Sequence, residues 1–484
     1  MEKLSLEQWL ARMQALHPKT IDMGFARIAP VYKKLNVAPT CPVFIVTGTN
    51  GKGSVCAMLE SILRCEGYKV GLYTSPHLVR YNERVRVDGV ELSDAQLVQS
   101  FEIVEAARGD VPLTFFEFAT LAAFVSFSKA NLEALVLEVG LGGRLDATNL
   151  VNADCAVVTS IALDHMDYLG PTREDIAREK LGVARAGKAL VFGEVNPPAN
   201  VELIVRGLEV LPPPGGEGWG EGAGANVATS IQEETSRFPN NISPEQTPSP
   251  PQSPQSPPPR GEGKSGLYLR RSINYSAVAD SATQWTYCAP DGRKMALPYP
   301  TLRGKFQIHN TATALAALFA LKEQLPVRAG SIREGLLTVE WPGRFQVLPG
   351  RPTVVLDAAH NPHAALVLDD ALSDMGYHPE TIAVFGMLND KDVAGVVAAL
   401  KNRVTQWHVV PTHGARGLSA EKIKETLCAA GVKDKWVTCF PTVEMAYVAA
   451  HKNAAETDRI IVFGSFHILG EAFDVIERNR RARA

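Results

Sequence analysis

The sequence lacks the features that mark membrane, secreted or nucleic-acid-binding proteins. Its seven cysteines are scattered and form no C-x-x-C pair, which argues against a zinc site or a disulfide framework. No apolar run is long enough to span a membrane, and residues 1–7 (MEKLSLE) lack the apolar core of a signal peptide. A net charge of −3 offers no attraction to nucleic acid or to an anionic membrane. We therefore expect a cytoplasmic protein that binds neither.

Composition and length indicate a globular protein of more than one domain. Hydrophobic residues make up 45% of the 484 residues and charged residues 21%, as in ordinary globular proteins. One stretch departs from this average, because residues 211–260 hold 12 of the 32 prolines, interleaved with Gly, Ser, Gln and Glu. Such a stretch buries too little apolar surface to offset its ordering entropy. We expect a disordered surface insert over about 205–266.

Outside the insert, short apolar runs alternate with helical patterns, which predicts two α/β units. The buried parallel strands predicted for the first unit lie at 44–46, 134–139 and 156–161. An alanine- and leucine-rich helix is predicted at 311–324, and the run WPGR at 341–344 then interrupts the pattern. We expect a hinge there, between one unit over 1–341 and a smaller doubly wound unit over 342–484. The strands predicted for the second unit lie at 353–356, 382–385, 407–410 and 460–463.

The most informative motif is the run TGTNGKGS at 47–54, between a predicted strand and apolar residues at helical spacing. A glycine-rich turn from strand into helix leaves backbone N–H groups free to surround phosphate, and the helix N-terminus adds favourable partial charge. Lys52 can reach a terminal phosphate, while a hydroxyl of the same run supplies an oxygen. The run departs from the usual P-loop, because Val46 replaces a glycine and Gly53 separates Lys52 from Ser54. This departure favours the nucleotide loop of a ligase over that of a GTPase or motor.

Polar residues follow further predicted strands, at the end where a parallel sheet collects its ligands. Glu138 precedes a glycine-rich run at 140–149, and Ser75 follows another apolar run. Asp164 and His165 come just after the next strand. Structural alternatives stay open, since the glycine-rich run can be a turn and the histidine a helix cap. Magnesium prefers oxygen ligands, so a carboxylate, a hydroxyl and phosphate oxygens form a suitable set, whereas histidine is a less usual ligand.

Two more clusters lie where chemistry is possible. Lys180 is on a helix predicted to begin near Thr172, and by composition alone it is a solvated lysine. In the second unit the run DAAHNP at 357–362 follows a predicted strand, and Arg344 lies at the hinge. A guanidinium can grip phosphate oxygens with paired hydrogen bonds. We expect this second-unit cluster to close over a nucleotide held by the first unit.

Together these runs resemble the bifunctional dihydrofolate synthase/folylpolyglutamate synthases of bacteria, a family within the Mur ligase superfamily. The resemblance extends nearly from end to end, apart from the proline-rich insert. It implies an α/β fold, with a P-loop ATPase domain of the Mur ligase type followed by a smaller Rossmann-like domain. The runs that carry it are TIDMG at 20–24, GTNGKGS at 48–54, SPHLVRYNER at 75–84, FFE at 115–117, residues 137–149, DH at 164–165, EK at 179–180, PGRFQ at 342–346, residues 357–362 and GSFH at 464–467.

The resemblance also implies roles for individual residues. ATP would be held by Thr49, Asn50, Gly51, Lys52, Gly53, Ser54, Asn310 at the adenine, and Arg344, Asp357 and His360 of the second domain. Magnesium, as two ions, would be bound through Ser75, Glu138 and His165. The pterin and pteroate pocket would be formed by Ile21, Asp22, Met23, Thr114, Phe115, Phe116, Glu117, Leu145, Asp146 and Ala147. The catalytic residues would be Lys52, His165 and Lys180, with Lys180 carbamylated so that a cation becomes an anion.

The implied reaction is the ATP-dependent addition of L-glutamate to dihydropteroate and to reduced folates, through an acyl phosphate, by a monomeric enzyme. Three alternatives remain: a folylpolyglutamate synthase alone, a Mur-type cell-wall amino-acid ligase, and a nucleotide-controlled switch that catalyses nothing. Asp146 within LDA and the run TFFE argue against the cell-wall ligase. The joint presence of Glu138, His165, Lys180 and Asp357 argues against the switch.

Overall fold

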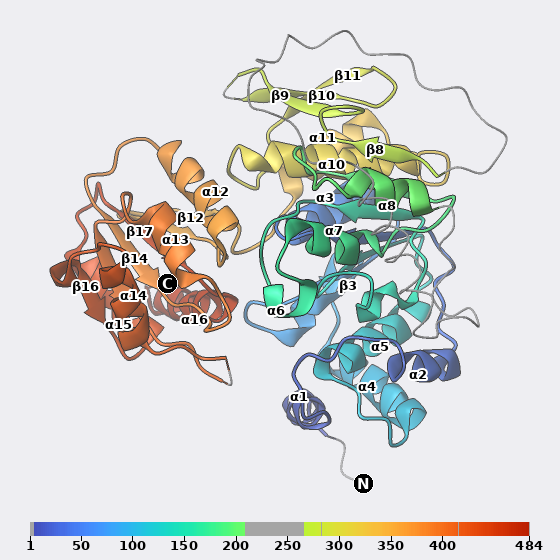
Figure 1. Ribbon diagram of the computed structural model, residues 1–484, viewed down its shortest axis with the longest axis horizontal. Coiled ribbons are helices and arrows are strands. Elements are labelled where there is room, and N and C mark those ends of the chain that lie inside the picture. The colour runs from blue at the N-terminus through green and yellow to red at the C-terminus, as the bar shows by residue number, and fades with distance from the viewer. Residues whose placement is uncertain (1–3, 209–265, 282, 415, 484) are drawn as a thin grey trace, which may run out of the picture.

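The computed structural model describes residues 4–208, 266–281, 283–414 and 416–483, with 481–483 described by backbone alone. The disorder predicted for the insert therefore falls almost wholly on residues outside this part. The described strands form three sheets, of which two belong to a larger body and the third to a smaller body beside it (Figure 1). Within the same residues, no helix combines the length and apolar character needed to cross a membrane.

The first sheet has parallel central strands whose two faces are both buried. Along β1, Ile45 packs into one hydrophobic core while Phe44 and Val46 pack into the other, as expected when side chains alternate across a strand. At one edge β3 and β4 run antiparallel to their neighbours. In spatial order the strands are β4 (Val90–Glu91), β3 (Val85–Val87), β2 (Val70–Tyr73), β5 (Ala134–Glu138), β1 (Val43–Thr47), β6 (Cys155–Val158), β7 (Ala189–Phe192) and β8 (Tyr268–Arg270).

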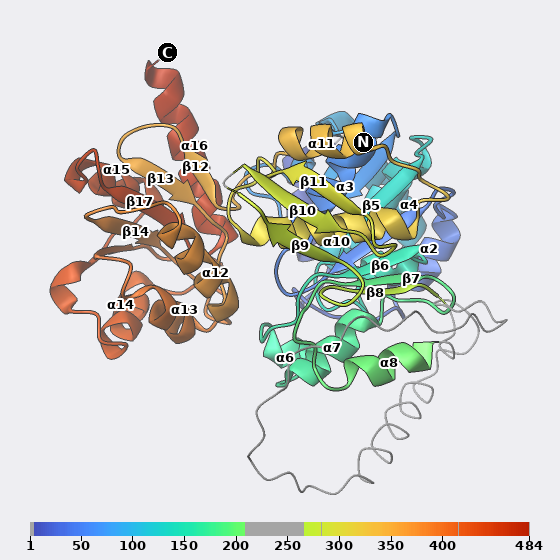
Figure 2. The same ribbon diagram turned by 90° about the horizontal axis from the view of Figure 1, so that it is seen from above.

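Helices cover both faces of this sheet (Figure 2). On one face lie α1 (Leu6–Ala15), α2 (Ile28–Leu35), α4 (Asp94–Arg108), α5 (Phe115–Ser128), α7 (Arg173–Leu181) and α8 (Val201–Gly207). On the other face lie α3 (Lys52–Glu66), α10 (Phe306–Ala320) and α11 (Ala329–Thr338). The helix predicted at 311–324 is thus α10, which both begins and ends earlier. The sequence prediction missed its first turn because the buried residue there, Gln307, is polar. The side chain of Gln307 turns inward and donates a hydrogen bond to Ser54.

A small antiparallel sheet outside the α10 and α11 layer is absent from the sequence prediction. Its strands are only four or five residues long and partly exposed, and Trp285 and Leu297 bury their side chains in the core beneath. The strands pair in the order β11 (Lys294–Pro298), β10 (Gln284–Cys288) and β9 (Ser276–Ala279).

The smaller body is a doubly wound α/β unit. Its strands lie in the order β12 (Gln346–Leu348), β13 (Thr353–Leu356), β17 (Arg459–Phe463), β14 (Thr381–Phe385), β15 (Gln406–Val409) and β16 (Val437–Cys439), all parallel except β12. One face is covered by α12 (Pro362–Ser373), α13 (Val393–Leu400) and α14 (Ala420–Ala429). The opposite face is covered by α15 (Val443–Asn453) and α16 (Phe466–Arg483) (Figure 2). The predicted α/β class, with a parallel-sheet domain followed by a doubly wound one, is confirmed.

The order of the central strands determines where the polar side chains meet. β2, β5, β1 and β6 are adjacent and parallel, so the segments that follow them leave the same edge of the sheet. Glu138 pairs in register with Val46, directly before the glycine-rich loop. The sheet therefore brings Ser75, Glu138, the loop at 48–51 and Asp164 to one edge.

Candidate active site

The loop between β1 and α3 is a tightly packed turn with its lysine folded inward. Gly48 and Gly51 have φ angles of 148° and 86°, which disfavour any side chain. A Cβ on Gly51 would also lie 2.7 Å from the side-chain oxygen of Asn310, on α10. Lys52 Nζ donates hydrogen bonds to the carbonyl oxygens of Gly48 (2.9 Å) and Thr49 (3.3 Å). The sequence thus places an amine and the first N–H groups of a helix at one turn, as phosphate binding requires.

Beside this loop lies the buried carboxylate of Glu138, one oxygen of which accepts a hydrogen bond. Glu138 is 3% exposed, and its Oε2 accepts a hydrogen bond from the backbone N–H of Ser75 (3.1 Å). Burial raises the pKa of Glu138, while the cations Lys52 and Arg344 act to lower it. Among the described residues, Oε1 has no hydrogen-bond partner. A hydroxyl, a buried carboxylate with a free oxygen and nearby phosphate-binding groups form a donor set that fits a hard divalent cation.

His165, the third predicted metal ligand, is held differently. Its Nε2 lies 3.0 Å from Lys391 Nζ of the second unit, and the structure shows no hydrogen bond from it to Ser75 or Glu138. Burial lowers the pKa of His165 to about 4, with the charge of Lys391 acting in the same direction. A neutral imidazole has one lone pair, and at Nε2 it faces the Lys391 amine, so Lys391 has to move away before this nitrogen can bind a metal.

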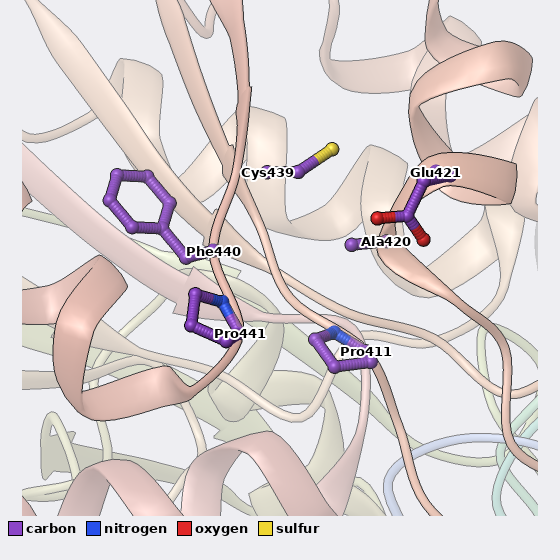
Figure 3. A pocket seen from close by; sticks show the side chains of 6 residues that line it. All are labelled: Pro411, Ala420, Glu421, Cys439, Phe440 and Pro441. Carbon is purple, nitrogen blue, oxygen red and sulfur yellow. The ribbon is translucent and has the colours of Figure 1, made fainter.

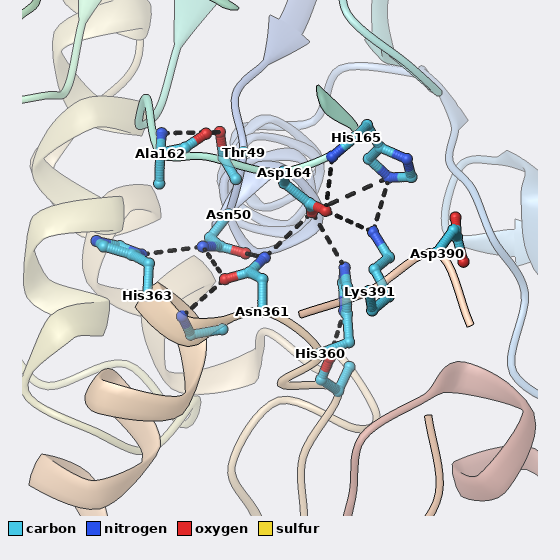
Figure 4. A network of polar contacts seen from close by, with 12 residues as sticks. Thr49, Asn50, Ala162, Asp164, His165, His360, Asn361, His363, Asp390 and Lys391 are labelled. Carbon is cyan, nitrogen blue, oxygen red and sulfur yellow. Dashed lines mark hydrogen bonds and ion pairs between the residues drawn. The ribbon is translucent and has the colours of Figure 1, made fainter. Parts of the chain in front are cut away.

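The two units are joined across this edge by a network of side chains (Figure 4). Asn50 in the glycine-rich loop and Asn361, which caps α12, exchange reciprocal amide hydrogen bonds of 3.2 and 3.1 Å. Asn50 Nδ2 also lies 2.9 Å from Nδ1 of His363. The nucleotide loop of the first unit is therefore in direct contact with the first turn of a helix in the second.

Asp164 is the centre of the same network. It accepts hydrogen bonds from Lys391 Nζ (2.6 Å) and Asn361 Nδ2 (3.2 Å), and its Oδ2 lies 3.6 Å from His360 Nε2. Burial opposes its charge, yet His360 and Lys391 hold the pKa of Asp164 well below its usual range. One carboxylate of the first unit thus binds several donors of the second (Figure 4).

Arg344 and Asp357 also come from the second unit. The guanidinium of Arg344 stacks 4.9 Å from the ring centroid of Phe466, and the charges of Glu138 and Asp357 both act on it. Both oxygens of Asp357 accept backbone N–H groups, from Phe345 (2.7 Å) and Ala359 (2.8 Å). Asp357 therefore shapes the loop that carries Arg344, in addition to any contact with a nucleotide.

Lys180 is a buried lysine, contrary to what its composition indicates. It lies on α7 and is 4% exposed, and no described residue accepts a hydrogen bond from its amine. Burial lowers the pKa of Lys180 to about 7, and the charge of Lys52 adds to that effect. Near neutral pH much of this amine is therefore uncharged and nucleophilic.

The residues predicted for an organic substrate meet where α2, α5 and η2 (Ala147–Leu150) contact one another. Asp22 binds Arg27 through a 2.6 Å ion pair, and Arg27 also reaches Glu117 at 3.1 Å. Glu117 and Thr114 form the capping box of α5, so their side chains have defined positions. Arg27 joins segments that are far apart in sequence, and nothing in the sequence pattern singled it out.

Aromatic and loop residues complete this region. Phe116 lies against Gly140, where a Cβ would approach its ring to 2.5 Å, and Phe115 lies under the guanidinium of Arg84 at 5.4 Å. Asp146 caps η2, accepting from the backbone and hydroxyl of Thr148 and from Leu141 N–H. Other predicted members with half-buried or buried side chains are Ile21, Met23, Leu145 and Ala147.

A separate pocket of about 250 Å³ lies on the smaller body (Figure 3). It opens beyond the carboxyl ends of β15 and β16, at the start of α14. It contains none of the predicted site residues. Its lining consists of Pro411, Ala420, Glu421, Cys439, Phe440 and Pro441.

The sequence prediction placed Asp164 at a strand end and Asn361 within the run expected to close over a nucleotide, without an individual role for either, and it named neither Lys391 nor Arg27. The sequence contains a signal for Asp164, Asn361 and Lys391, because each follows a strand of a parallel sheet. Their pairing across the two units could not be predicted, since it depends on how the units sit together.

The chain is similar to known proteins over most of its length. The Mur ligase middle domain matches residues 46–189, and the Mur ligase glutamate ligase domain matches 343–466. The chain is 41% identical over 478 residues to a dihydrofolate synthase/folylpolyglutamate synthase of Escherichia coli, covering 98% of this chain and 96% of that protein.

Solved structures of related proteins superpose on nearly the whole chain. Escherichia coli FolC in complex with DHPP and ADP superposes with a TM-score of 0.82 at 39% identity, covering 99% of both chains. A Yersinia pestis folylpolyglutamate synthase/dihydrofolate synthase complexed with AMPPNP and a Mn ion superposes with a TM-score of 0.79 at 37% identity, covering 98% of both. The chain therefore belongs to the dihydrofolate synthase/folylpolyglutamate synthase family of Mur ligases.

Proposed function

We propose that the protein is an ATP-dependent ligase that joins L-glutamate to dihydropteroate, forming dihydrofolate, and to reduced folates, forming folylpolyglutamates. One observation carries the proposal. The buried carboxylate of Glu138 lies close enough to Lys52 of the P-loop and to Arg344 of the second unit for its charge to interact with both cations. The full-length similarity to enzymes of that name supports the choice of substrates.

The chemistry follows from the weakness of a carboxylate as an electrophile. Transfer of the γ-phosphoryl group of ATP to the substrate carboxylate forms an acyl phosphate, which has a good leaving group. The amino group of glutamate then attacks the carbonyl carbon, phosphate departs and an amide remains. The acceptor carboxyl is the benzoate of dihydropteroate, or the terminal γ-carboxyl of a reduced folate.

The chain's own residues position the reactants and balance their charge. Lys52 lies at the N-terminus of α3, where it can neutralise charge that develops on the transferred phosphoryl group. Arg344 can bind phosphate oxygens from the opposite side. Contacts of Asn50 and Asp164 with the second unit hold the two units together at this edge, which would limit the access of water to the acyl phosphate.

Ser75, Glu138 and His165 are proposed to hold magnesium, as two ions with the help of phosphate oxygens. When bound, the metal supplies positive charge beside the phosphates. The half-satisfied buried carboxylate of Glu138 supports this role, as do the related structures that contain a divalent ion. Lys180 is proposed to react with CO₂ and become a carbamate in the same region.

The remaining assignments are also proposals. We assign ATP and folate binding to a domain over 1–341 and glutamate ligation to a domain over 342–484, and we propose a monomer that acts in the cytoplasm without nucleic acid. Adenine is assigned to the surroundings of Asn310, which packs against Gly51.

The pterin and pteroate moieties are assigned to the region around Asp22, Arg27 and Glu117. We expect Arg27→Ala to raise the KM for dihydropteroate about tenfold, because two carboxylates lose the donor that orients them. The KM for ATP should change little. Arg12→Ala is the control, since Arg12 forms a more exposed pair with Glu105. Equal increases in both KM values would contradict the assignment.

The proposed function is tested by measuring ADP release with ATP, L-glutamate and either dihydropteroate or a reduced folate. A ligase sustains ADP release over many turnovers only when both organic substrates are present, and mass spectrometry identifies the glutamylated product. Release that needs neither organic substrate would indicate a nucleotide switch. Release with reduced folate but never with dihydropteroate would indicate a folylpolyglutamate synthase alone.

A further inference from the structure

The P-loop contains a glycine that its backbone does not require. Gly53 is the second residue of α3, and its φ angle lies outside the left-handed region that favours glycine. Glycine is also among the least stabilising residues in a helix. The neighbouring side chain explains it: a Cβ at this position would lie 2.6 Å from Nε1 and 3.1 Å from Cε2 of Trp341. The indole therefore occupies the space that a side chain would need.

Trp341 is held on another side by a cation that is itself attached to α3. The guanidinium of Arg86, on β3, lies 5.3 Å from the indole centroid. Arg86 forms an ion pair with Glu60, which is 3% exposed. Glu60 and Gly53 are two helical turns apart and so lie on the same side of α3. The P-loop helix thus provides both the surface under the indole and the anchor for its cation.

From the contact between Trp341 and Gly53, the chain continues into the second unit. After Pro342, Gly343 adopts a φ angle of 72° and its carbonyl accepts a hydrogen bond from Ala358 N–H (3.0 Å). Arg344 follows Trp341 by three positions, a span of about 10 Å at most. The position of the indole therefore restricts where the guanidinium of Arg344 can lie relative to Lys52 and Glu138.

We propose that Trp341 is a positioning residue that fixes the segment between the two units to the first turn of the P-loop helix and thereby places Arg344. Position 53 is a glycine because any side chain there would overlap this indole. The inference rests on the proposed function, since the phosphates of ATP are the target assigned to Arg344.

A double-mutant cycle tests the contact. Gly53→Ala should weaken ADP binding and lower kcat, each about tenfold, because the added methyl overlaps the indole. Trp341→Leu removes that overlap, so adding Gly53→Ala to Trp341→Leu should cost much less than adding it to the wild type. ADP affinity, measured by titration calorimetry, reports the coupling even in a protein without ligase activity. Independent, multiplying effects of the two substitutions on ADP affinity would overturn the proposal.

A second measurement separates positioning from simple packing. Trp341→Phe keeps a ring beside Arg86 and should retain most of kcat, whereas Trp341→Ala should lose about tenfold with an unchanged unfolding temperature for the first unit. Trp341→Phe should also lose the nucleotide-dependent change in tryptophan fluorescence, which Trp436→Phe, at a more exposed site, should keep. If Trp341→Phe and Trp341→Ala are equally impaired, Trp341 does not place Arg344.

Discussion

Lys52→Ala is expected to abolish ligation while leaving the fold intact. The amine lies at the N-terminus of α3 and already binds the carbonyl oxygens of Gly48 and Thr49, so it is held within the phosphate loop. Burial lowers the pKa of Lys52, while Glu138 and Asp164 act to keep it charged. Its removal takes away a cation that is proposed to balance the charge of the transferred phosphoryl group. We expect kcat to fall on the order of 10³-fold.

Two further variants separate lost charge from lost packing. Lys52→Met keeps most of the apolar stem and should be nearly as inactive as Lys52→Ala. Lys129→Ala removes an exposed lysine at the end of α5 and should match the wild type. ADP release measures turnover, and circular dichroism with thermal unfolding checks the fold. Turnover near that of the wild type in a folded Lys52→Ala protein would contradict the phosphate role.

Lys180→Ala is expected to lose activity about 10²-fold, in line with other residues that support a metal site. The reason is the environment of its amine, which is buried and close to Lys52. A neutral amine attacks CO₂, a nitrogen–carbon bond forms and one proton leaves, so a potential cation becomes an anion. That anion would compensate the positive charge of Lys52 and of a bound divalent cation.

The pH dependence has a definite sign. The pKa of Lys180 is lowered to about 7, so below that pH the amine is an ammonium without a lone pair and cannot react. Carbamate formation should therefore rise as the pH increases through about 7. With ¹³C-labelled bicarbonate, an NMR carbamate signal should appear in the wild type and be absent from Lys180→Ala.

A control exists on the same helix. Arg178 is exposed on α7 and forms a surface ion pair with Asp175, so Arg178→Ala should keep both the carbamate signal and the activity. An active Lys180→Ala enzyme, or a wild type that incorporates no label, would remove the carbamate from the mechanism.

The sequence was sufficient for the buried central strands of the two large sheets but not for the small antiparallel sheet. Runs such as 353–356 and 460–463 were recognised because strands buried on both faces are continuously apolar. The β9–β11 sheet was missed, since its strands are only four or five residues long, so that even the alternation of β10 extends over few residues. α10 was placed too late in the chain because Gln307 turns its polar side chain into the protein.

For the site, the local sequence pattern identified some of the residues but not the residues that they contact. Glu138 and the loop at 48–54 were recognisable, because Glu138 ends a strand of a parallel sheet and the loop follows one. Burial of Lys180 was not, since a lysine on a polar helix looks solvated in sequence. Arg27 and Lys391 gained their significance only through Glu117 and Asp164, which lie far from them along the chain.

By itself, the sequence determined the α/β architecture and the glycine-rich turn between strand and helix, because apolar periodicity and a glycine-rich run act over neighbouring residues. The family followed from motif runs that resemble it along nearly the whole chain. Only the tertiary structure decided which groups touch across the two units. Asn50 and Asn361 are 311 positions apart and still exchange hydrogen bonds, and the indole of Trp341 lies on Gly53. Contacts of this kind depend on how complete units pack together, which no local pattern of residues encodes.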